Sequence, residues 1–155
     1  MKVERINFEN PEEMRQVFKI YRLYVEKVNR EFPLSELPVP RAWLLPFIVG
    51  QNMAMDYLRK DMAFYKVCVN GEVSSVACVM PYPLKDKIIP SIHLFAETVE
   101  DFKRIAPLVK KKAEQELKRK FCFVLIKNEK LDLELEEQGW KRIAQDDYYV
   151  FLTRS

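Results

Sequence analysis

The chain has 155 residues, of which 48% are hydrophobic and 32% charged, and its formal net charge at pH 7 is +3. These values suit one globular domain spanning residues 1–155, and no run of about 18 apolar residues occurs that would predict a membrane span. The 26 basic and 23 acidic residues predict a mixed surface, which excludes the basic footprint of a nucleic-acid-binding protein.

The expected compartment is the cytoplasm, because the first residues lead into polar sequence with no apolar signal core. Cys68, Cys78 and Cys122 all lie in strand-like sequence, and we expect small buried hydrophobes in a reducing compartment. No Cys-x-x-Cys occurs and the chain has one histidine, so a zinc site is not expected. Many Lys and Glu with only three Gly hint at a thermophilic source.

The N-terminal third predicts one strand and two helical regions. A short strand is expected over Lys2–Phe8. Asn10 is an N-cap residue, Pro11 suits the first helical position and two acids follow, so a helix begins there and its apolar stripe continues to about Asn29. After a proline-rich loop, Ala42–Met62 is a second helical region.

The clearest hairpin joins Phe64–Val69 to Glu72–Met80 through an Asn-Gly pair, which suits a turn with positive φ at both central residues. Pairing across this turn places Cys68 opposite Val73 and puts Cys78 on the other sheet face. A disulfide between the two cysteines is therefore excluded.

The remaining elements alternate between strands and helices. Prolines at 81, 83 and 90 are expected to bracket a loop, after which Ser91–Ala96 is a buried strand. Thr98–Lys120 has helical apolar spacing, and the uncharged run Phe121–Ile126 is typical of a buried strand. A charged helix follows up to a Gly-Trp stop, and Arg142–Leu152 forms the last strand. The expected order is β-α-α-β-β-β-α-β-α-β.

One segment of the last helix has a competing signal. Leu131–Leu135 alternates apolar and acidic residues with period two, as a strand does. We favour the helix, because Leu and Glu are strong helix formers and Gly139 suits a left-handed helix C-cap.

This element order resembles the GNAT acetyltransferase superfamily over nearly the whole chain. That superfamily often shows a strand, then Asn-x-x-Ala-x-x-x-Tyr-x-x-x-Gly-Phe, then a final strand. Here Asn128 holds the first position, Leu131 the small apolar position, Leu135 the Tyr position, and Gly139-Trp140 the end. The resemblance implies an α/β (α+β) fold: a mixed, mostly antiparallel, twisted sheet flanked by about four helices.

The resemblance also implies where acetyl-CoA binds. In GNAT proteins the fourth and fifth strands splay apart, and backbone groups of the fourth strand pair with the pantetheine arm. This role falls to Leu94, Phe95 and Ala96, and Asn128 is a further expected cofactor contact. The pyrophosphate of the cofactor lies on amides at the start of the next helix, at a Gln/Arg-x-x-Gly-x-Gly/Ala loop whose glycines let it approach.

The segment in the matching register, residues 101–106, departs from that loop and leaves two alternatives. In one, the helix begins near Ala106, and Lys103, Arg104 and the local amides hold the pyrophosphate. In the other, Thr98 caps the helix and the acids beside it, including Asp101, repel an anion. We favour the second, because Thr-x-x-Asp before an apolar stripe is itself a helix-start signal.

Candidate acid and base groups are few. The family commonly uses a carboxylate or His near the fourth strand as the base, for which Glu97 and His93 are available. A Tyr on the last helix often protonates the leaving thiolate, and Leu135 at this position cannot. One of three other tyrosines could act as the acid if the fold places it at the acetyl-CoA cleft: Tyr82, Tyr148 or Tyr149.

Two functions follow from the resemblance. The first is an N-acetyltransferase that moves acetyl from acetyl-CoA to a primary amine of a small molecule or peptide, with a homodimer as a plausible assembly. The alternative is a GNAT-like binding or interaction module that has lost catalysis and does not use CoA. A helix start near Ala106 favours the enzyme, and a start at Thr98 favours the module.

Overall fold

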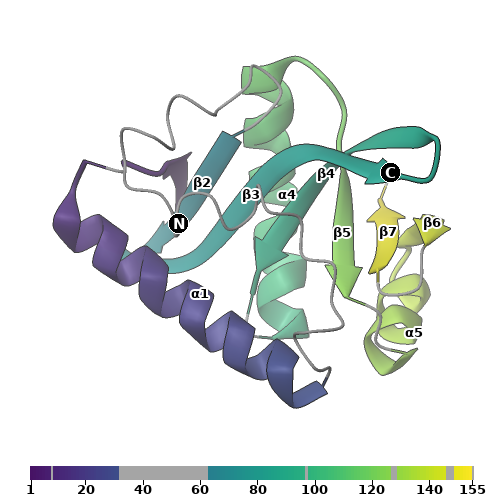
Figure 1. Ribbon diagram of the computed structural model, residues 1–155, viewed down its shortest axis with the longest axis horizontal. Coiled ribbons are helices and arrows are strands. Elements are labelled where there is room, and N and C mark those ends of the chain that lie inside the picture. Colours follow the sequence, from purple (N-terminus) through teal and green to yellow (C-terminus); the bar gives the residue numbers. More distant parts are fainter. Residues whose placement is uncertain (8, 32–62, 97, 127–128, 146–148, 155) are drawn as a thin grey trace.

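A computed structural model describes residues 1–7, 9–31, 63–96, 98–126, 129–145 and 149–154. Within these ranges the chain forms three helices and seven strands (Figure 1). In chain order they are β1 (Lys2–Arg5), α1 (Pro11–Glu31), β2 (Ala63–Val69), β3 (Glu72–Leu84), β4 (Lys87–Phe95), α4 (Val99–Leu117), β5 (Cys122–Ile126), α5 (Glu129–Glu137), β6 (Lys141–Gln145) and β7 (Tyr149–Thr153). The second helical region expected over Ala42–Met62 lies outside the described residues.

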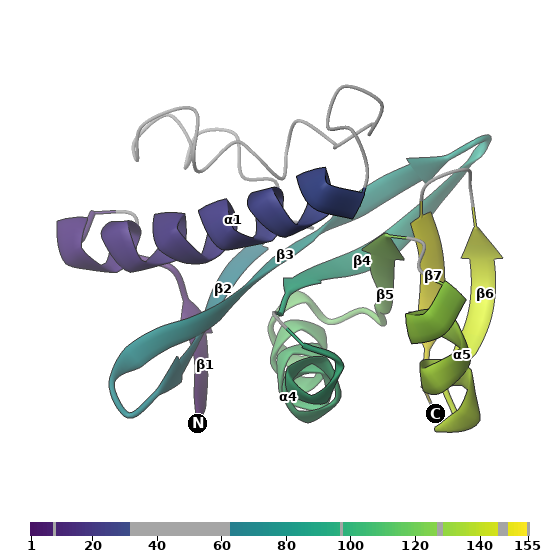
Figure 2. The same cartoon turned by 90° about the horizontal axis from the view of Figure 1, so that it is seen from below.

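The strands form a single sheet in the order β1-β2-β3-β4-β5-β7-β6. All neighbouring pairs are antiparallel except β4 and β5, which run parallel. Helix α1 covers one face of this twisted sheet, and α4 and α5 lie on the other face (Figure 2). The predicted mixed, mostly antiparallel architecture is confirmed.

Each face of the sheet has its own apolar core, because alternate residues of a strand point to opposite faces. Along β4, Ile92 and Leu94 pack in the core on the α4 side with Ile105 and Val109 of the helix. Phe95 belongs to the core on the α1 side. The β4 side chains are thus sorted between the two faces, and His93 lies on the α1 face.

Helix α1 begins as predicted. Asn10 caps it, since its Oδ1 accepts a hydrogen bond from the Glu13 amide at 3.1 Å. Glu13 then reaches the sheet, where it forms an ion pair with Lys66 of β2 and accepts the Asn7 amide hydrogen bond. The helix is therefore fixed to the sheet by a charged contact as well as by apolar packing.

The Asn-Gly hairpin is also confirmed. Asn70 and Gly71 have φ of 53° and 81°, and Cys68 pairs with Val73. A bulge between Val67 and Cys68 then shifts the register by one residue, which the sequence did not reveal. All three cysteines are free.

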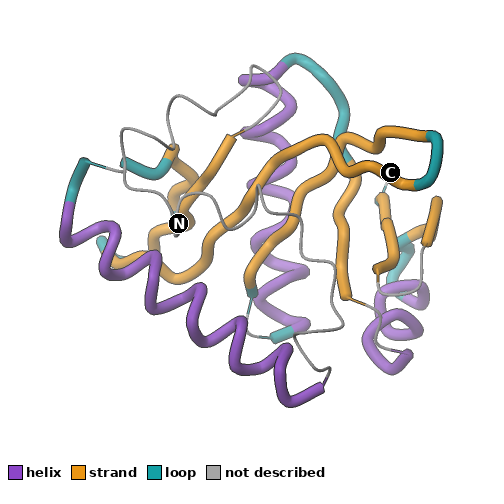
Figure 3. The backbone as a smooth tube through the Cα atoms, in the orientation of Figure 1, coloured by secondary structure: helices purple, strands orange, loops and turns teal. Residues whose placement is uncertain are grey.

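The loop expected around the prolines is instead part of a long hairpin. β3 continues through Pro81 and Pro83 to Leu84, and β4 begins at Lys87, before Pro90 (Figure 3). In a hairpin with a two-residue turn, the residues flanking the turn exchange hydrogen bonds and alternate pairs do not. All three prolines fall in the alternate pairs, Pro81↔Pro90 and Pro83↔Ile88, so no hydrogen bond between the strands is lost.

The C-terminal segment differs from expectation in one respect. Residues 142–152 do not form one strand, because β6 and β7 pair antiparallel across residues 146–148. The helix favoured over a strand at 131–135 is confirmed as α5. Gly139, with φ of 92°, ends it, and the Trp140 amide donates to the Leu135 carbonyl at 3.0 Å.

Candidate functional site

The candidate site lies where the two parallel strands separate. The β4–β5 ladder pairs Ser91 with Cys122 and Ile92 with Phe123, and the described strands continue past these pairs without pairing to each other. Figure 1 shows the start of β5 beside the middle of β4 and the two strands apart at their C-terminal ends. We call the segments His93–Phe95 and Val124–Ile126 the β4–β5 fork.

The β4 side of the fork presents backbone groups in the geometry of a strand edge. Every second residue of His93–Phe95 directs its N–H and C=O toward β5, as in any strand. Leu94 and Phe95 are buried, and Ala96 at the end of the strand is half-buried. A ligand with its own amide groups can pair with such an edge as an added strand does.

His93 projects from the fork onto the α1 face. It is 2% exposed, and its ring lies 4.8 Å from that of Phe95 in an edge-on arrangement. Burial lowers the pKa of His93 to about 3, because the apolar surroundings disfavour the charged imidazolium. The imidazole is therefore neutral at pH 7 and is a weak base.

Two tyrosines meet on the same face of the sheet, beside β5. Tyr149 pairs in register with Ile126, the residue at the open end of β5. The ring of Tyr82, from the β3–β4 hairpin, lies 5.6 Å from that of Tyr149 and 5.0 Å from that of Phe151. The fold thus brings two of the three candidate tyrosines to the β5 side of the fork, while Tyr148 lies outside the described residues.

Leu135, at the family's tyrosine position, is fully buried in the core on the α4 side. Trp140, next to the helix end, packs against Phe102 and Phe123 at centroid distances of 5.4 and 5.5 Å. Leu135 and Trp140, two residues of the segment that carries the sequence resemblance, therefore belong to the core, and Leu135 places no proton donor in the fork.

Helix α4 begins directly after β4. Its N-cap is Thr98, whose hydroxyl accepts the Asp101 amide hydrogen bond at 3.1 Å. Phe102 donates its amide to the Thr98 carbonyl at 3.0 Å, which is the first turn of the helix. The helix therefore begins at the Thr98 cap, as favoured from the sequence, and not near Ala106.

Ala106 consequently lies within the helix and not at its start. It is buried, and its amide is part of the helical hydrogen-bond ladder. Pro107 is accommodated inside α4. The role implied for the amides near Ala106 would require a helix that begins later than this one does.

The two cations of this segment are each paired with a carboxylate. Lys103 lies 3.0 Å from Glu100 and 3.4 Å from Glu134 of α5. The hydrogen bond to Glu100 raises the pKa of Lys103, and Glu134 adds to this shift. Arg104 pairs with Asp101 at 3.0 Å. Of the other predicted site residues, Glu97 and Asn128 lie outside the described residues.

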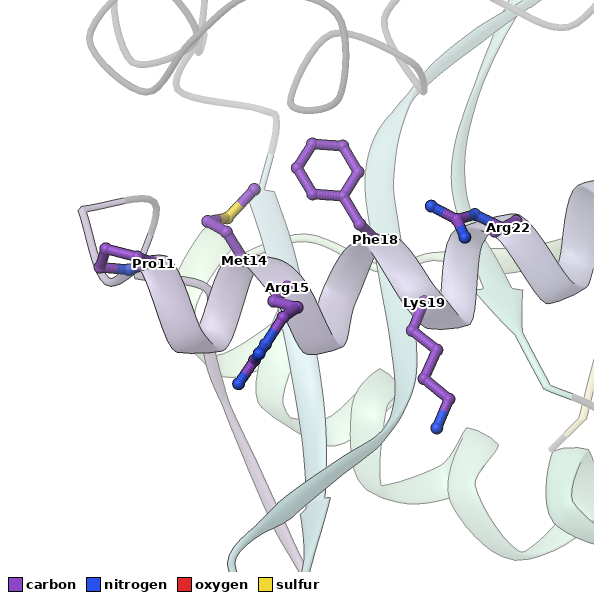
Figure 4. A pocket seen from close by; sticks show the side chains of 6 residues that line it. All are labelled: Pro11, Met14, Arg15, Phe18, Lys19 and Arg22. Carbon is purple, nitrogen blue, oxygen red and sulfur yellow. The ribbon is translucent and has the colours of Figure 1, made fainter.

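A separate groove of about 560 Å³ runs along α1. Figure 4 shows Met14 and Phe18 projecting to one side of the helix and Lys19 to the other. The groove follows the N-terminal half of α1, which lies beside β2 and β3 and away from β5 (Figure 1). It is therefore not part of the fork.

No metal site is found among the described residues, in which no three His, Cys, Asp or Glu side chains gather closely enough to bind an ion. No helix within the described ranges has the length and hydropathy needed to cross a bilayer.

No protein-family model and no curated protein match this sequence. Solved structures nevertheless match it along nearly its whole length. An acetyltransferase of the GNAT family from Streptococcus pneumoniae superposes with a TM-score of 0.51 at 11% identity, covering 97% of this chain and 96% of that one. The Campylobacter jejuni N-acetyltransferase PseH gives 0.56 at 17% identity, covering 99% and 98%. The PseH structure in complex with acetyl coenzyme A gives 0.52 at 17%, covering 99% and 100%.

At these identities the likeness concerns the fold. The chain has the fold of the GNAT acetyltransferases, in a divergent form.

Proposed function

We propose that this protein is an N-acetyltransferase that moves an acetyl group from acetyl-CoA to a primary amine of a small molecule or a peptide. The β4–β5 fork is the observation that supports the proposal. It combines a parallel strand pair that separates with a strand edge able to pair with the amides of a pantetheine arm. A structure of the same fold, PseH, was solved in complex with acetyl coenzyme A.

In this proposal the backbone of Leu94–Ala96 holds the pantetheine arm, and the thioester lies in the fork. The amine nitrogen attacks the thioester carbonyl carbon, a C–N bond forms and the C–S bond breaks. The amine loses a proton and the leaving thiolate gains one. Holding the two reactants together in this geometry is the main contribution expected from the strand edge.

Of the groups proposed for proton transfer, His93, Tyr82 and Tyr149 lie on the α1 face of the sheet. Glu97 and His93 are the proposed bases, and the low pKa of His93 favours a role in accepting a hydrogen bond from the amine over full proton uptake. Tyr82 or Tyr149 is the proposed proton donor, because both lie beside β5 on that face. Asn128 is a further proposed cofactor contact, whereas Lys103, Arg104 and Ala106 are not, because α4 begins at Thr98 and both cations are paired with carboxylates.

Calorimetry with CoA tests the proposal most directly. We expect saturable heat below millimolar ligand, and transfer to a panel of amines detected as free thiol. Ala96→Trp places a bulky ring at the end of β4 and is expected to abolish binding. Ala144→Trp on β6 is the matched control, since it replaces another half-buried alanine on a strand that β7 separates from the fork. Absence of heat at millimolar CoA would refute the proposal.

A second candidate function is a binding module that has lost catalysis and does not use CoA. Two observations favour it: α4 begins at Thr98 among acidic residues, and Leu135 is part of the core. CoA retained by the purified protein would count strongly against this candidate. So would any turnover that Ala96→Trp removes and Ala144→Trp preserves.

A further inference from the structure

The start of α4 is poorly suited to hold a diphosphate. Diphosphate sites at helix starts use free amides and glycines that let the backbone approach the phosphate. In this chain no glycine occurs between Gly71 and Gly139, so every residue of the first turn carries a Cβ atom. The Asp101 amide already donates a hydrogen bond to the Thr98 hydroxyl. Only the amides of Val99 and Glu100 in the first turn are therefore without a hydrogen bond to the cap or within the helix.

The charges around this helix start also disfavour an anion. Glu100 and Asp101 lie in the first turn, where they already complement the positive end of the helix dipole. Lys103 and Arg104 are each engaged by a carboxylate, and Glu134 of α5 adds a third. A diphosphate would have to displace these carboxylates before it could use either cation.

The groove beside the helix start does not change this balance. Asp101 lines one wall of a groove that extends to α1 and the start of β3. Its charged lining consists of two cations and three carboxylates: Arg15, Lys19, Glu12, Glu72 and Asp101. Arg15 is itself paired with Glu12. An incoming diphosphate therefore meets a net negative surface from this side as well.

The β4–β5 fork, in contrast, offers the strand edge with which a pantetheine arm can pair. The arm carries two amides, which pair with a strand edge through neutral hydrogen bonds and need no positive charge. The residues present thus fit one part of acetyl-CoA and not the other.

From this contrast we infer that the acyl donor is recognised as a pantetheine thioester, and that the diphosphate of CoA contributes nothing to its binding. The inference rests on the proposed function and specifies its donor. Any acyl group carried on a pantetheine arm is then a substrate, whether or not a nucleotide is attached.

The experiment compares three donors with one amine acceptor: acetyl-CoA, acetyl-4′-phosphopantetheine and acetyl-pantetheine. We expect kcat/KM values that agree within about threefold, because the groups that differ make no favourable contact. A kcat/KM for acetyl-CoA more than about thirtyfold above that for acetyl-pantetheine overturns the inference, since charge-assisted hydrogen bonds to the diphosphate produce preferences of that size. Lack of transfer from all three donors refutes the proposed function itself.

A paired variant gives an independent readout. Glu100→Gln with Asp101→Asn removes the first-turn charges but keeps the side-chain shapes. We expect the preference for acetyl-CoA over acetyl-pantetheine to rise about three- to thirtyfold, and to fall again in high salt. Glu137→Gln, at an exposed position of α5, is the control and should leave the ratio unchanged. An unchanged ratio in the double variant would show that these carboxylates do not repel the diphosphate, against the inference.

Discussion

The ion pair between Glu13 of α1 and Lys66 of β2 provides a quantitative test of how the helix is fixed to the sheet. The two side chains are only 10% and 12% exposed. Glu13 also accepts the Asn7 amide hydrogen bond, and Lys66 has a second, more distant carboxylate in Glu4, at 3.8 Å. Removing either partner leaves a charge with little water to solvate it.

The expected magnitudes follow from what each variant leaves behind. Lys66→Met leaves Glu13 with a single amide donor and should lower the free energy of unfolding by about 3 kcal/mol. Glu13→Gln leaves Lys66 near Glu4 and should lower it by about 2 kcal/mol. The double variant has no unpaired charge, so its loss should be about 2 kcal/mol, which gives a coupling energy of about 3 kcal/mol.

Urea unfolding at pH 7 followed by circular dichroism measures these values, provided that the m-value stays constant across the series. The control is Arg15→Met, which breaks an exposed ion pair with Glu12 on the same helix and should change stability by less than about 0.5 kcal/mol. If the losses of the two single variants add within about 0.5 kcal/mol in the double variant, the two charges are not coupled and the reasoning fails.

Three further predictions concern single residues. Because the folded pKa of His93 is about 3 and the unfolded value is 6.5, the unfolded chain binds a proton first as pH falls. The free energy of unfolding should therefore fall as the pH is lowered from 6 to 4, and it should fall by about 1.4 kcal/mol per pH unit more in the unsubstituted protein than in His93→Gln. Urea unfolding at each pH measures both slopes, and equal slopes would contradict the burial of a neutral imidazole. Gly139→Ala should cost about 1–2 kcal/mol in the same assay, because φ is 92° while the added Cβ meets no atom within 4 Å; an unchanged midpoint would argue against the left-handed cap. Glu116→Gln should cost about 1–2 kcal/mol, because Glu116 accepts hydrogen bonds from Tyr65 at 2.7 Å and Arg5 at 3.1 Å; a loss as small as that of Glu137→Gln would show that this network is not stabilising.

The elements that local chemistry determines were predictable from the sequence. Asn10 and Pro11 define the start of α1, and Gly139 defines the end of α5. The choice of helix over strand at 131–135 was also decided correctly by propensity and the glycine stop. These signals involve residues a few positions apart, where a sequence is most informative.

The features that were missed depend on long-range pairing. Prolines are typical of loops, and only the register of β3 with β4 shows that Pro81, Pro83 and Pro90 avoid the hydrogen-bonded pairs. The split of the last strand into β6 and β7 likewise depends on how the segment folds back on itself. Neither the β3–β4 register nor the split into β6 and β7 can be recognised from the residues of one local segment.

The candidate site shows the same division. Thr98 was predictable as a cap because its partner is three residues away. The separation of β4 from β5 was expected from the superfamily resemblance and not from any residue pattern. The contact of Lys103 with Glu134, and that of Tyr82 with Tyr149, join segments far apart in the chain, so the sequence alone offered no sign of either.

The prolines of the β3–β4 hairpin bear on association between molecules. The last β2–β3 pair is Ala63↔Val79, and no strand of the described residues pairs with this edge of β3 from residue 80 to residue 84. Pro81 and Pro83 lie on this edge at alternate positions and remove the donors that an incoming strand from another molecule would need. These two prolines therefore disfavour pairing between molecules along the longest hairpin of the described sheet, and substituting both of them should increase aggregation.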